Sequence, residues 1–190
     1  MTTNYSSTQD SRRVQVEVSV QDYFNDFLPV KLTSNQDNIE RIPAKTWEDW
    51  FQCWVEILQT ELPVASGYEL SLRLTNDAEI QALNAQYRQQ NQPTDVLAFA
   101  ALETEFPDLT EIIVHPLYLG DIVISVDTAE QQAIQQGHSL KTELAWLAAH
   151  GLLHLMGWDH PDDDRLNQML NQQVSLLQKV GIAITQQNYG

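Results

Sequence analysis

Three histidines lie within eleven residues, in the segment H-G-L-L-H-L-M-G-W-D-H at positions 150–160. On an α-helix, residues four apart lie on one face, so His150 and His154 can offer two imidazole nitrogens to one ion. Gly157 favours a left-handed helix end, and the six residues after His154 span at most roughly 20 Å, which lets His160 return to the same place. The spacing predicts a three-histidine metal site, in preference to three core histidines satisfied by ordinary hydrogen bonds.

Three neutral ligands would leave Zn²⁺ with its full charge and an open fourth position for water. Because such a water has a pKa near 7 and the ion can polarise a phosphoryl oxygen, hydrolysis is the expected reaction class. The spacing also matches H-E-x-x-H-x-x-G-x-x-H zinc peptidases, but Gly151 occupies the position of their general-base glutamate. This weakens the peptidase interpretation. Asp159 is expected to orient a ligand rather than to act as the acid or base.

A buried central helix must position the histidines. Ser139 can cap it, and apolar residues cover most of its circumference. Alternation or apolar runs predict strands over residues 14–20, 70–74, 96–100 and 119–126. Capping residues and helical spacing predict four further helices: one from Thr46, one from Asn76 to about Arg88, one from Asp127 to about residue 136, and a last helix with Pro161 in its first turn. The tryptophans at positions 47, 50 and 54 are expected in the core, with stacking on nucleic-acid bases as the alternative.

The connections between these elements carry fewer signals. Residues 22–45 are expected to form a loop or linker, and the irregular stretch 101–118 is expected to border a functional cleft. His115 and His138 are predicted in surface loops and are not offered as ligands. For Asp121 two interpretations stay open: it orients a ligand across the cleft, or it caps a strand end.

The composition restricts the partners of this site. The chain of 190 residues suits one domain, and its 26 acidic against 10 basic residues give a net charge of −16. Such a charge opposes non-specific attraction to nucleic acid, so a polyanion must be bound locally. The single Cys53 cannot form an internal disulfide, and neither a secretory signal nor a membrane-spanning run is visible, so a cytoplasmic location is expected. Residues 1–12 are predicted to be a disordered tail before a domain over residues 13–190.

The histidine segment closely resembles the signature H-G-x-L-H-L-x-G-Y-D-H of the YbeY-type endoribonucleases, also called rRNA maturation factors. Upstream, L-N-A-Q-Y-R at 83–88, P-T-D-V-L-A-F at 93–99 and G-D-I-V-I-S at 120–125 are similar to further landmarks of that family, in the same order. The resemblance covers about residue 68 to the C-terminus. The chain departs from the family pattern at four positions: Gln89 for glycine, Ala98 for serine, Ala100 for proline and Trp158 for tyrosine.

The resemblance implies a single-domain α/β (α+β) fold, with a mixed four-stranded sheet, about five helices and the metal site on the central buried helix. It implies one Zn²⁺ per chain on His150, His154 and His160. The implied activity is a single-strand-specific endoribonuclease in 16S rRNA 3′-end maturation and ribosome quality control, with ribosomal RNA, the small ribosomal subunit and ribosome-assembly proteins as partners. A zinc peptidase-like hydrolase, or a ribosome-assembly binding protein with a structural zinc, are the alternatives.

Arg88 is predicted to bind substrate phosphate. From residue 101 onward the chain has three basic residues against twelve acidic ones, so a cation for a polyanion must come from upstream. Arg88 shares a helix face with Ile80 and Asn84, which directs it toward the interior edge of the domain. Its guanidinium can hold phosphate oxygens in a bidentate manner, as the resemblance also implies, whereas a structural ion pair with Asp95 is the alternative.

Overall fold

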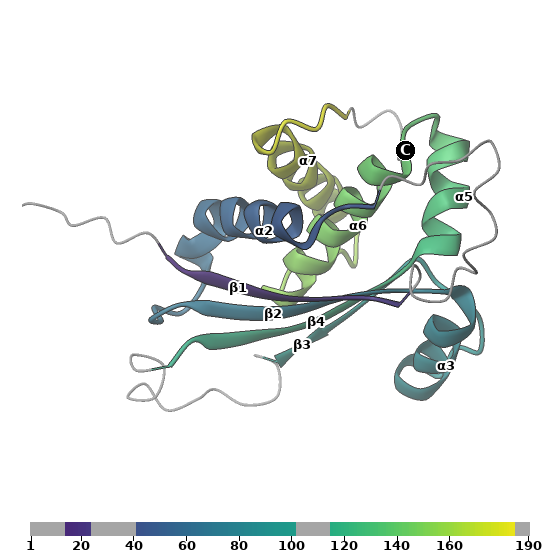
Figure 1. Ribbon diagram of the computed structural model, residues 1–190, viewed down its shortest axis with the longest axis horizontal. Coiled ribbons are helices and arrows are strands. Elements are labelled where there is room, and N and C mark those ends of the chain that lie inside the picture. Colours follow the sequence, from purple (N-terminus) through teal and green to yellow (C-terminus); the bar gives the residue numbers. More distant parts are fainter. Residues whose placement is uncertain (1–13, 24–40, 102–114, 185–190) are drawn as a thin grey trace, which may run out of the picture.

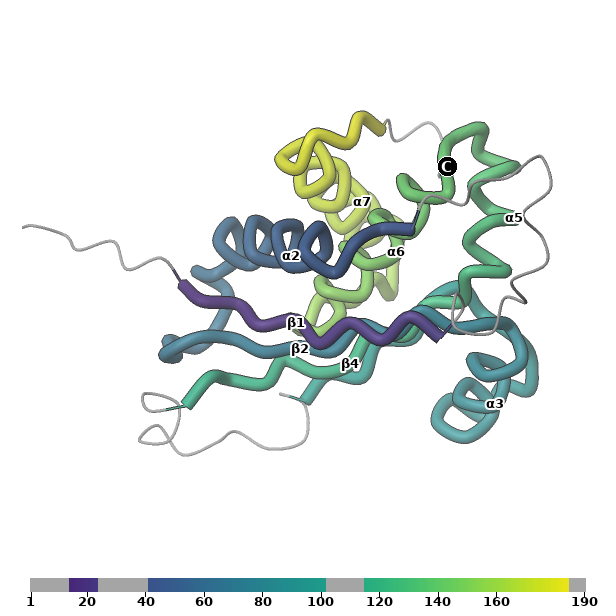
Figure 2. Tube along the Cα trace, viewed as in Figure 1, coloured from purple at the N-terminus to yellow at the C-terminus, as the bar shows by residue number. Residues whose placement is uncertain are grey.

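A computed structural model of the chain describes residues 14–23, 41–101 and 115–184. Its centre is one four-stranded sheet in the order β1-β2-β4-β3. The strands are β1 (Val16–Asp22), β2 (Tyr68–Thr75), β3 (Val96–Ala100) and β4 (Leu117–Ser125). Strands β1, β2 and β4 are parallel, as Figure 2 lets the reader follow, and β3 is antiparallel to β4. The predicted mixed four-stranded sheet is therefore confirmed.

Five α-helices accompany the sheet in the described residues: α2 (Ala44–Leu58), α3 (Asp77–Arg88), α5 (Val126–Gln136), α6 (Leu140–Leu155) and α7 (Asp163–Lys179), with a short 3-10 turn over Gln59–Glu61. Helix α2 packs on β1, α6 packs on β3 and β4, and α7 packs on α6. In Figure 1 these three helices cover one face of the sheet. Helix α3 contacts β3 and β4 through a small separate cluster that includes Ile80, Leu97 and Val123.

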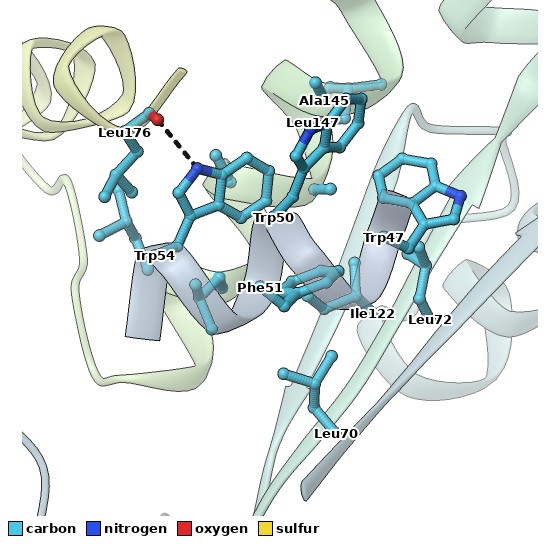
Figure 3. Packing of buried hydrophobic residues seen from close by; sticks show 14 of the residues in the cluster. Trp47, Trp50, Phe51, Trp54, Leu70, Leu72, Ile122, Ala145, Leu147 and Leu176 are labelled. Carbon is cyan, nitrogen blue, oxygen red and sulfur yellow. Dashed lines mark hydrogen bonds between the residues drawn. The ribbon is translucent and has the colours of Figure 1, made fainter. Parts of the chain in front are cut away.

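The main core lies between the sheet and α2, α6 and α7. Trp47, Phe51 and Trp54 of α2 are fully buried there, and Trp50 is 6% exposed (Figure 3). The indole N–H of Trp54 donates to the carbonyl of Leu176, with 2.9 Å between nitrogen and oxygen, which ties α2 to α7. Because these rings are inside the protein, they cannot stack on nucleic-acid bases, and the predicted core role is confirmed.

Several predicted element ends are wrong by a few residues. Helix α2 begins at Ala44, after the extended Pro43, and not at a Thr46 cap. Helix α5 is capped by Ser125, whose hydroxyl accepts from the backbone N–H of Thr128, and not by Asp127. Helix α7 is capped by Asp162, so Pro161 precedes the helix instead of lying in its first turn. For α5 and α7 a neighbouring residue also has capping chemistry, and the sequence does not rank such neighbours, whereas α2 begins after a proline without any side-chain cap.

The fourth strand starts at Leu117, two residues before the predicted start, because Leu117 and Tyr118 pair with the beginning of β2. The predicted tail over residues 1–12, and most of the predicted loops 22–45 and 101–118, lie outside the described residues. Their ends are regular structure: β1 runs to Asp22, and α2 starts at Ala44. Across the three described ranges, none of the helices combines the length and apolar character needed to cross a membrane.

Candidate metal centre

Helix α6 carries two of the three predicted ligands through the middle of the protein. Ser139 caps it as predicted, since its hydroxyl accepts from the backbone N–H of Thr142, at 3.1 Å. The helix ends before Gly157, whose φ of +85° lies in the left-handed region. The backbone N–H of Trp158 then donates to the carbonyl of Leu153, at 3.0 Å, which reverses the chain. This turn brings His160 back beside the helix.

The structure brings His150, His154 and His160 together. One ring nitrogen from each lies within 4.8 Å of the other two, and the Nε2 atoms of His150 and His154 are 3.0 Å apart. Ligands held at about 2.0–2.1 Å by a tetrahedral zinc ion are roughly 3.3 Å from one another. The three side chains therefore need only small adjustments to hold such an ion.

Hydrogen bonds on the far side of two rings determine which nitrogen faces the site. The Nδ1 of His154 lies 2.9 Å from the carbonyl oxygen of Trp158, which can only accept, so Nδ1 carries the proton. Gln173 donates its amide N–H to the carbonyl of Trp146, at 3.3 Å, which turns its oxygen toward the Nδ1 of His150, at 3.2 Å. That Nδ1 is a donor as well.

In the neutral rings both Nε2 atoms consequently present lone pairs to each other at 3.0 Å. Two lone pairs at this separation repel unless a cation lies between them. This is the arrangement expected of metal ligands and not of core histidines that bond to each other. The donor set thus fits a metal ion on chemical grounds, in addition to its spacing.

Burial keeps these imidazoles neutral. It is the largest cause that lowers the pKa of His150 to about 4, and the charge on His154 acts in the same direction. Burial also lowers the pKa of His154, and the nearby Arg88 adds to this effect. A neutral imidazole is the form that binds a metal, so His150 and His154 are ready to bind one at neutral pH without losing a proton.

His150 and His154 line a cleft of about 440 Å³, which lies between α6 and β3. Arg88, Trp158 and Asp159 also line it. The Nη2 of Arg88 donates to the backbone carbonyl of Ala98, at 3.2 Å. Among the described contacts, Asp95 accepts instead from the backbone of Val96 and the side-chain amide of Gln132, so the alternative ion pair between Arg88 and Asp95 is not formed.

Two acidic residues near the motif behave differently. Asp159 accepts from the backbone N–H of its neighbour His160, at 2.8 Å, which suits the predicted orienting role. Asp121 lies within β4, where it accepts from the hydroxyl of Tyr118, at 2.8 Å, and it lines a second cavity together with Tyr87 and Phe99. It neither reaches the histidine cleft nor caps a strand end, so neither interpretation of Asp121 holds.

The two remaining described histidines lie outside this centre. His115 is exposed, as predicted. The surface-loop prediction for His138 is wrong: its side chain is 12% exposed, and its Nε2 makes a short contact with the carboxylate of Glu143, itself only 1% exposed. Gly137, with φ at +71°, turns the chain so that His138 packs against the first turn of α6. This contact holds the carboxylate of Glu143 away from the three clustered histidines.

Gln173 is the functional residue that the sequence prediction missed. It is fully buried on α7, and it contacts a predicted ligand on another helix. Its position gave one signal, because it lies four residues after Met169 and three before Leu176, which is the spacing of one helix face. A glutamine on such a face needs buried hydrogen-bond partners.

The chain matches the family model described as endoribonuclease YbeY over residues 32–181. The endoribonuclease YbeY of Trichormus variabilis is 60% identical over 171 residues, which cover 90% of this chain and 97% of the relative. That of a Nostoc species is 57% identical over 178 residues, which cover 94% of this chain and 97% of the relative.

The solution structure of TM1509 from Thermotoga maritima has the same fold. Its TM-score is 0.51 at 23% identity, and the match covers 87% of this chain and 89% of the other. Together with the histidine centre, the extent of the sequence matches leaves one assignment. The chain belongs to the endoribonuclease YbeY family.

Proposed function

We propose that the protein is a zinc-dependent endoribonuclease that cleaves single-stranded RNA. In this proposal His150, His154 and His160 bind one zinc ion per chain, and Arg88 binds the phosphate at which cleavage takes place. The observation that supports it most is the pair of facing Nε2 lone pairs in a cleft that also holds an arginine. The relatives named endoribonuclease YbeY supply the substrate class.

The proposal extends to the biological role. By its relationship to endoribonuclease YbeY proteins, the chain acts in the cytoplasm in 16S rRNA 3′-end maturation and ribosome quality control, with the small ribosomal subunit and its assembly proteins as partners. Residues 13–190 act as one hydrolase domain, and residues 1–12 as a tail.

The zinc site, Arg88 and the groups that orient the imidazoles have separate roles in this proposal. Bound zinc would supply a Lewis acid for the phosphoryl oxygen and would make a bound water acidic enough to attack at neutral pH. Arg88 lines the same cleft, where its guanidinium can leave the carbonyl of Ala98 and grip two phosphate oxygens. Gln173 and the carbonyl of Trp158 hold two of the imidazoles in the binding orientation.

The structure disfavours a peptidase. A Cβ atom at Gly151, where zinc peptidases carry the general-base glutamate, would lie 2.7 Å from the Cγ2 of the fully buried Ile122. This position faces the sheet and has no room for a carboxylate. A binding protein with a structural zinc would have the same three ligands. Only a measurement of RNA cleavage distinguishes that alternative from an enzyme.

The direct test incubates a labelled single-stranded RNA with purified protein, with chelator and with chelator followed by zinc. We expect cleavage that the chelator abolishes and zinc restores, while casein stays intact. The variant His154→Ala should lose both the zinc and the activity, whereas the control His115→Ala, which changes an exposed histidine outside the cleft, should keep both. Wild-type metal content in His154→Ala would disprove the site, and RNA binding without turnover would favour the structural zinc.

Arg88 is tested by two substitutions. Arg88→Ala removes the cation, and Arg88→Lys keeps the charge but loses the planar group that holds two oxygens at once. Both variants should remain folded and retain zinc while losing RNA cleavage, with the larger loss in Arg88→Ala. Normal cleavage by a folded Arg88→Ala protein would remove Arg88 from the mechanism.

A further inference from the structure

The strand β3 forms one border of the sheet, and its unpaired side faces the histidine cleft. It pairs with β4 alone, at the end of the strand order (Figure 1). Val96, Ala98 and Ala100 all line the cleft, together with His150, His154 and Arg88. The unpaired side of a border strand carries backbone donors and acceptors that no neighbouring strand uses.

The register shows which residues point outward. The backbone N–H of Ser125 donates to the carbonyl of Asp95, at 2.8 Å, which directs the backbone groups of Asp95 toward β4. In an antiparallel pair this direction alternates, so Leu97 and Phe99 also bond to β4, whereas residues 96, 98 and 100 point away from it. The Arg88 bond to the carbonyl of Ala98 agrees with this alternation. We call the outward backbone groups of residues 96, 98 and 100 the outer edge of β3.

Part of the outer edge is already occupied. The N–H of Val96 donates to the carboxylate of Asp95, at 2.8 Å, and the carbonyl of Ala98 accepts from Arg88. The N–H groups of Ala98 and Ala100 have no acceptor among the described residues of the chain. Two backbone donors therefore point into a cleft that is also lined by the guanidinium of Arg88 and the imidazoles of His150 and His154.

We propose that the outer edge of β3 binds the sugar-phosphate backbone of the RNA strand, with the N–H groups of Ala98 and Ala100 donating to phosphate oxygens. The nature of this ligand rests on the proposed function. Backbone N–H groups are established phosphate donors in proteins, and here they lie beside Arg88, whose positive charge favours an anion. Each alanine adds only a methyl group, so a bulky anion can approach the backbone closely.

The occupied groups favour RNA over an extended peptide. A peptide strand added to the sheet would need the N–H of Val96 as a ladder donor, and that N–H is already engaged by the carboxylate of Asp95. Phosphate needs donors only, which are the groups that remain at Ala98 and Ala100. The outward carbonyl of Ala100 can accept from a ribose 2′-hydroxyl, which RNA provides and a peptide lacks.

Backbone amide NMR of the zinc-loaded full chain tests the inference directly. The probe is a nuclease-resistant single-stranded oligouridylate with phosphorothioate linkages. We expect the amide signals of Ala98 and Ala100 to shift and their hydrogen exchange to slow on binding. The amides of Leu97 and Phe99, which bond to β4, should change little and serve as internal controls. Binding without this alternation would overturn the proposal, as would stronger protection of Ala98 and Ala100 by an extended peptide.

A substitution gives an independent measurement. Ala98→Pro removes one outward N–H without removing a bond to β4, and proline is tolerated at such border positions. Loss of a hydrogen bond to a charged group should weaken binding of the oligouridylate about tenfold. The control His115→Ala, which changes an exposed residue outside the cleft, should bind within about twofold of wild type, and both variants should retain zinc. Equal affinities of the two variants would contradict the inference.

The two proposals fail in different ways. If RNA is cleaved but the Ala98 and Ala100 amides do not respond, the outer edge is not the binding surface and the endoribonuclease proposal stands. If no single-stranded RNA is bound or cleaved by zinc-loaded protein, both proposals are wrong.

Discussion

The buried side-chain amide of Gln173 determines which nitrogen of His150, a predicted metal ligand, faces the cleft. Gln173 bridges two helices, since it donates to the carbonyl of Trp146 on α6 and accepts from the Nδ1 of His150. Because the donor end of the amide is engaged, only its oxygen can face the imidazole, and the lone pair of His150 is left on Nε2. An apolar residue of similar size would fill the space without fixing the ring.

The first prediction concerns this bridge. Gln173→Met should lower zinc affinity about 10–100-fold, because loss of a hydrogen-bond partner of a metal ligand has an effect of this size. Competition with a chromogenic chelator measures it. Gln178→Met, an exposed glutamine on the same helix, is the matched control and should bind zinc like wild type. A Gln173→Met protein with wild-type affinity would show that His150 needs no such support.

The second prediction concerns pH and the metal-free protein. Burial lowers the pKa of His150 to about 4, whereas in the unfolded chain it is about 6.5. Between these values the unfolded chain binds a proton that the folded chain does not, so stability falls as the pH falls. The free energy of unfolding of chelated protein should drop by about 2 kcal/mol from pH 7 to pH 5.

Urea titrations at the two pH values check this prediction. In the variant His150→Gln, which has no titrating group at this position, the drop should be clearly smaller than in wild type. An equal drop in both proteins would assign the pH dependence to other groups.

At the residue scale, the sequence predicted the cluster of three histidines because their spacing is local. His150 and His154 are one helical turn apart, and Gly157 returns the chain to them within six residues. The roles of Gln173 and His138 depend on which helix lies beside which. That placement follows from tertiary packing and leaves no fixed spacing in the sequence.

The close approach of α6 to β4 is what places the histidine helix at the sheet. Gly151 makes this approach possible, because any Cβ there would meet Ile122 at 2.7 Å, well inside van der Waals contact. Gly151→Ala should therefore destabilise the fold. Overpacking costs about 1–3 kcal/mol, which equals or exceeds the roughly 1 kcal/mol that alanine gains over glycine in a helix.

A double-mutant cycle with Ile122→Ala, followed by urea unfolding, tests this third prediction. Removing the Ile122 side chain creates the space that the added methyl group needs. Gly151→Ala should lower the urea midpoint in the wild-type background and raise it in the Ile122→Ala background. The same sign in both backgrounds would mean that α6 does not depend on this contact.

At the element scale, the kind and order of the described elements could be predicted, because apolar periods and capping residues repeat along each of them. The strand Val96–Ala100 was predicted to the residue, since a turn signal precedes it. Element ends were less predictable where two capping candidates are neighbours, as at Ser125 and Asp127. The antiparallel direction of β3 depends on how β3 and β4 are connected, and the family resemblance implied only that the sheet is mixed.

The charge of the whole molecule opposes its proposed substrate. With a net charge of −16, the protein repels RNA at long range, so binding must depend on a few groups in the cleft. Among the described residues that line the cleft, Arg88 is the only lysine or arginine. Backbone donors, which carry no net charge, and a bound cation would supply the remaining attraction.

The last prediction follows from this charge distribution. Each phosphate that a cation neutralises on a single strand contributes a slope of about −0.7 to a plot of log affinity against log salt. With one arginine and one metal ion in the cleft, the slope should lie at roughly −0.7 to −2, far shallower than for a protein with a basic binding surface. Fluorescence anisotropy with the phosphorothioate oligouridylate at several KCl concentrations measures it.

Arg88→Ala should make this slope shallower by about 0.7, because one neutralised phosphate is lost. The control Lys179→Ala removes an exposed cation in the last turn of α7 and should leave the slope unchanged. A slope of about −4 or steeper would require several further cations in contact with RNA, and the cleft would then account for only a minor part of the binding surface.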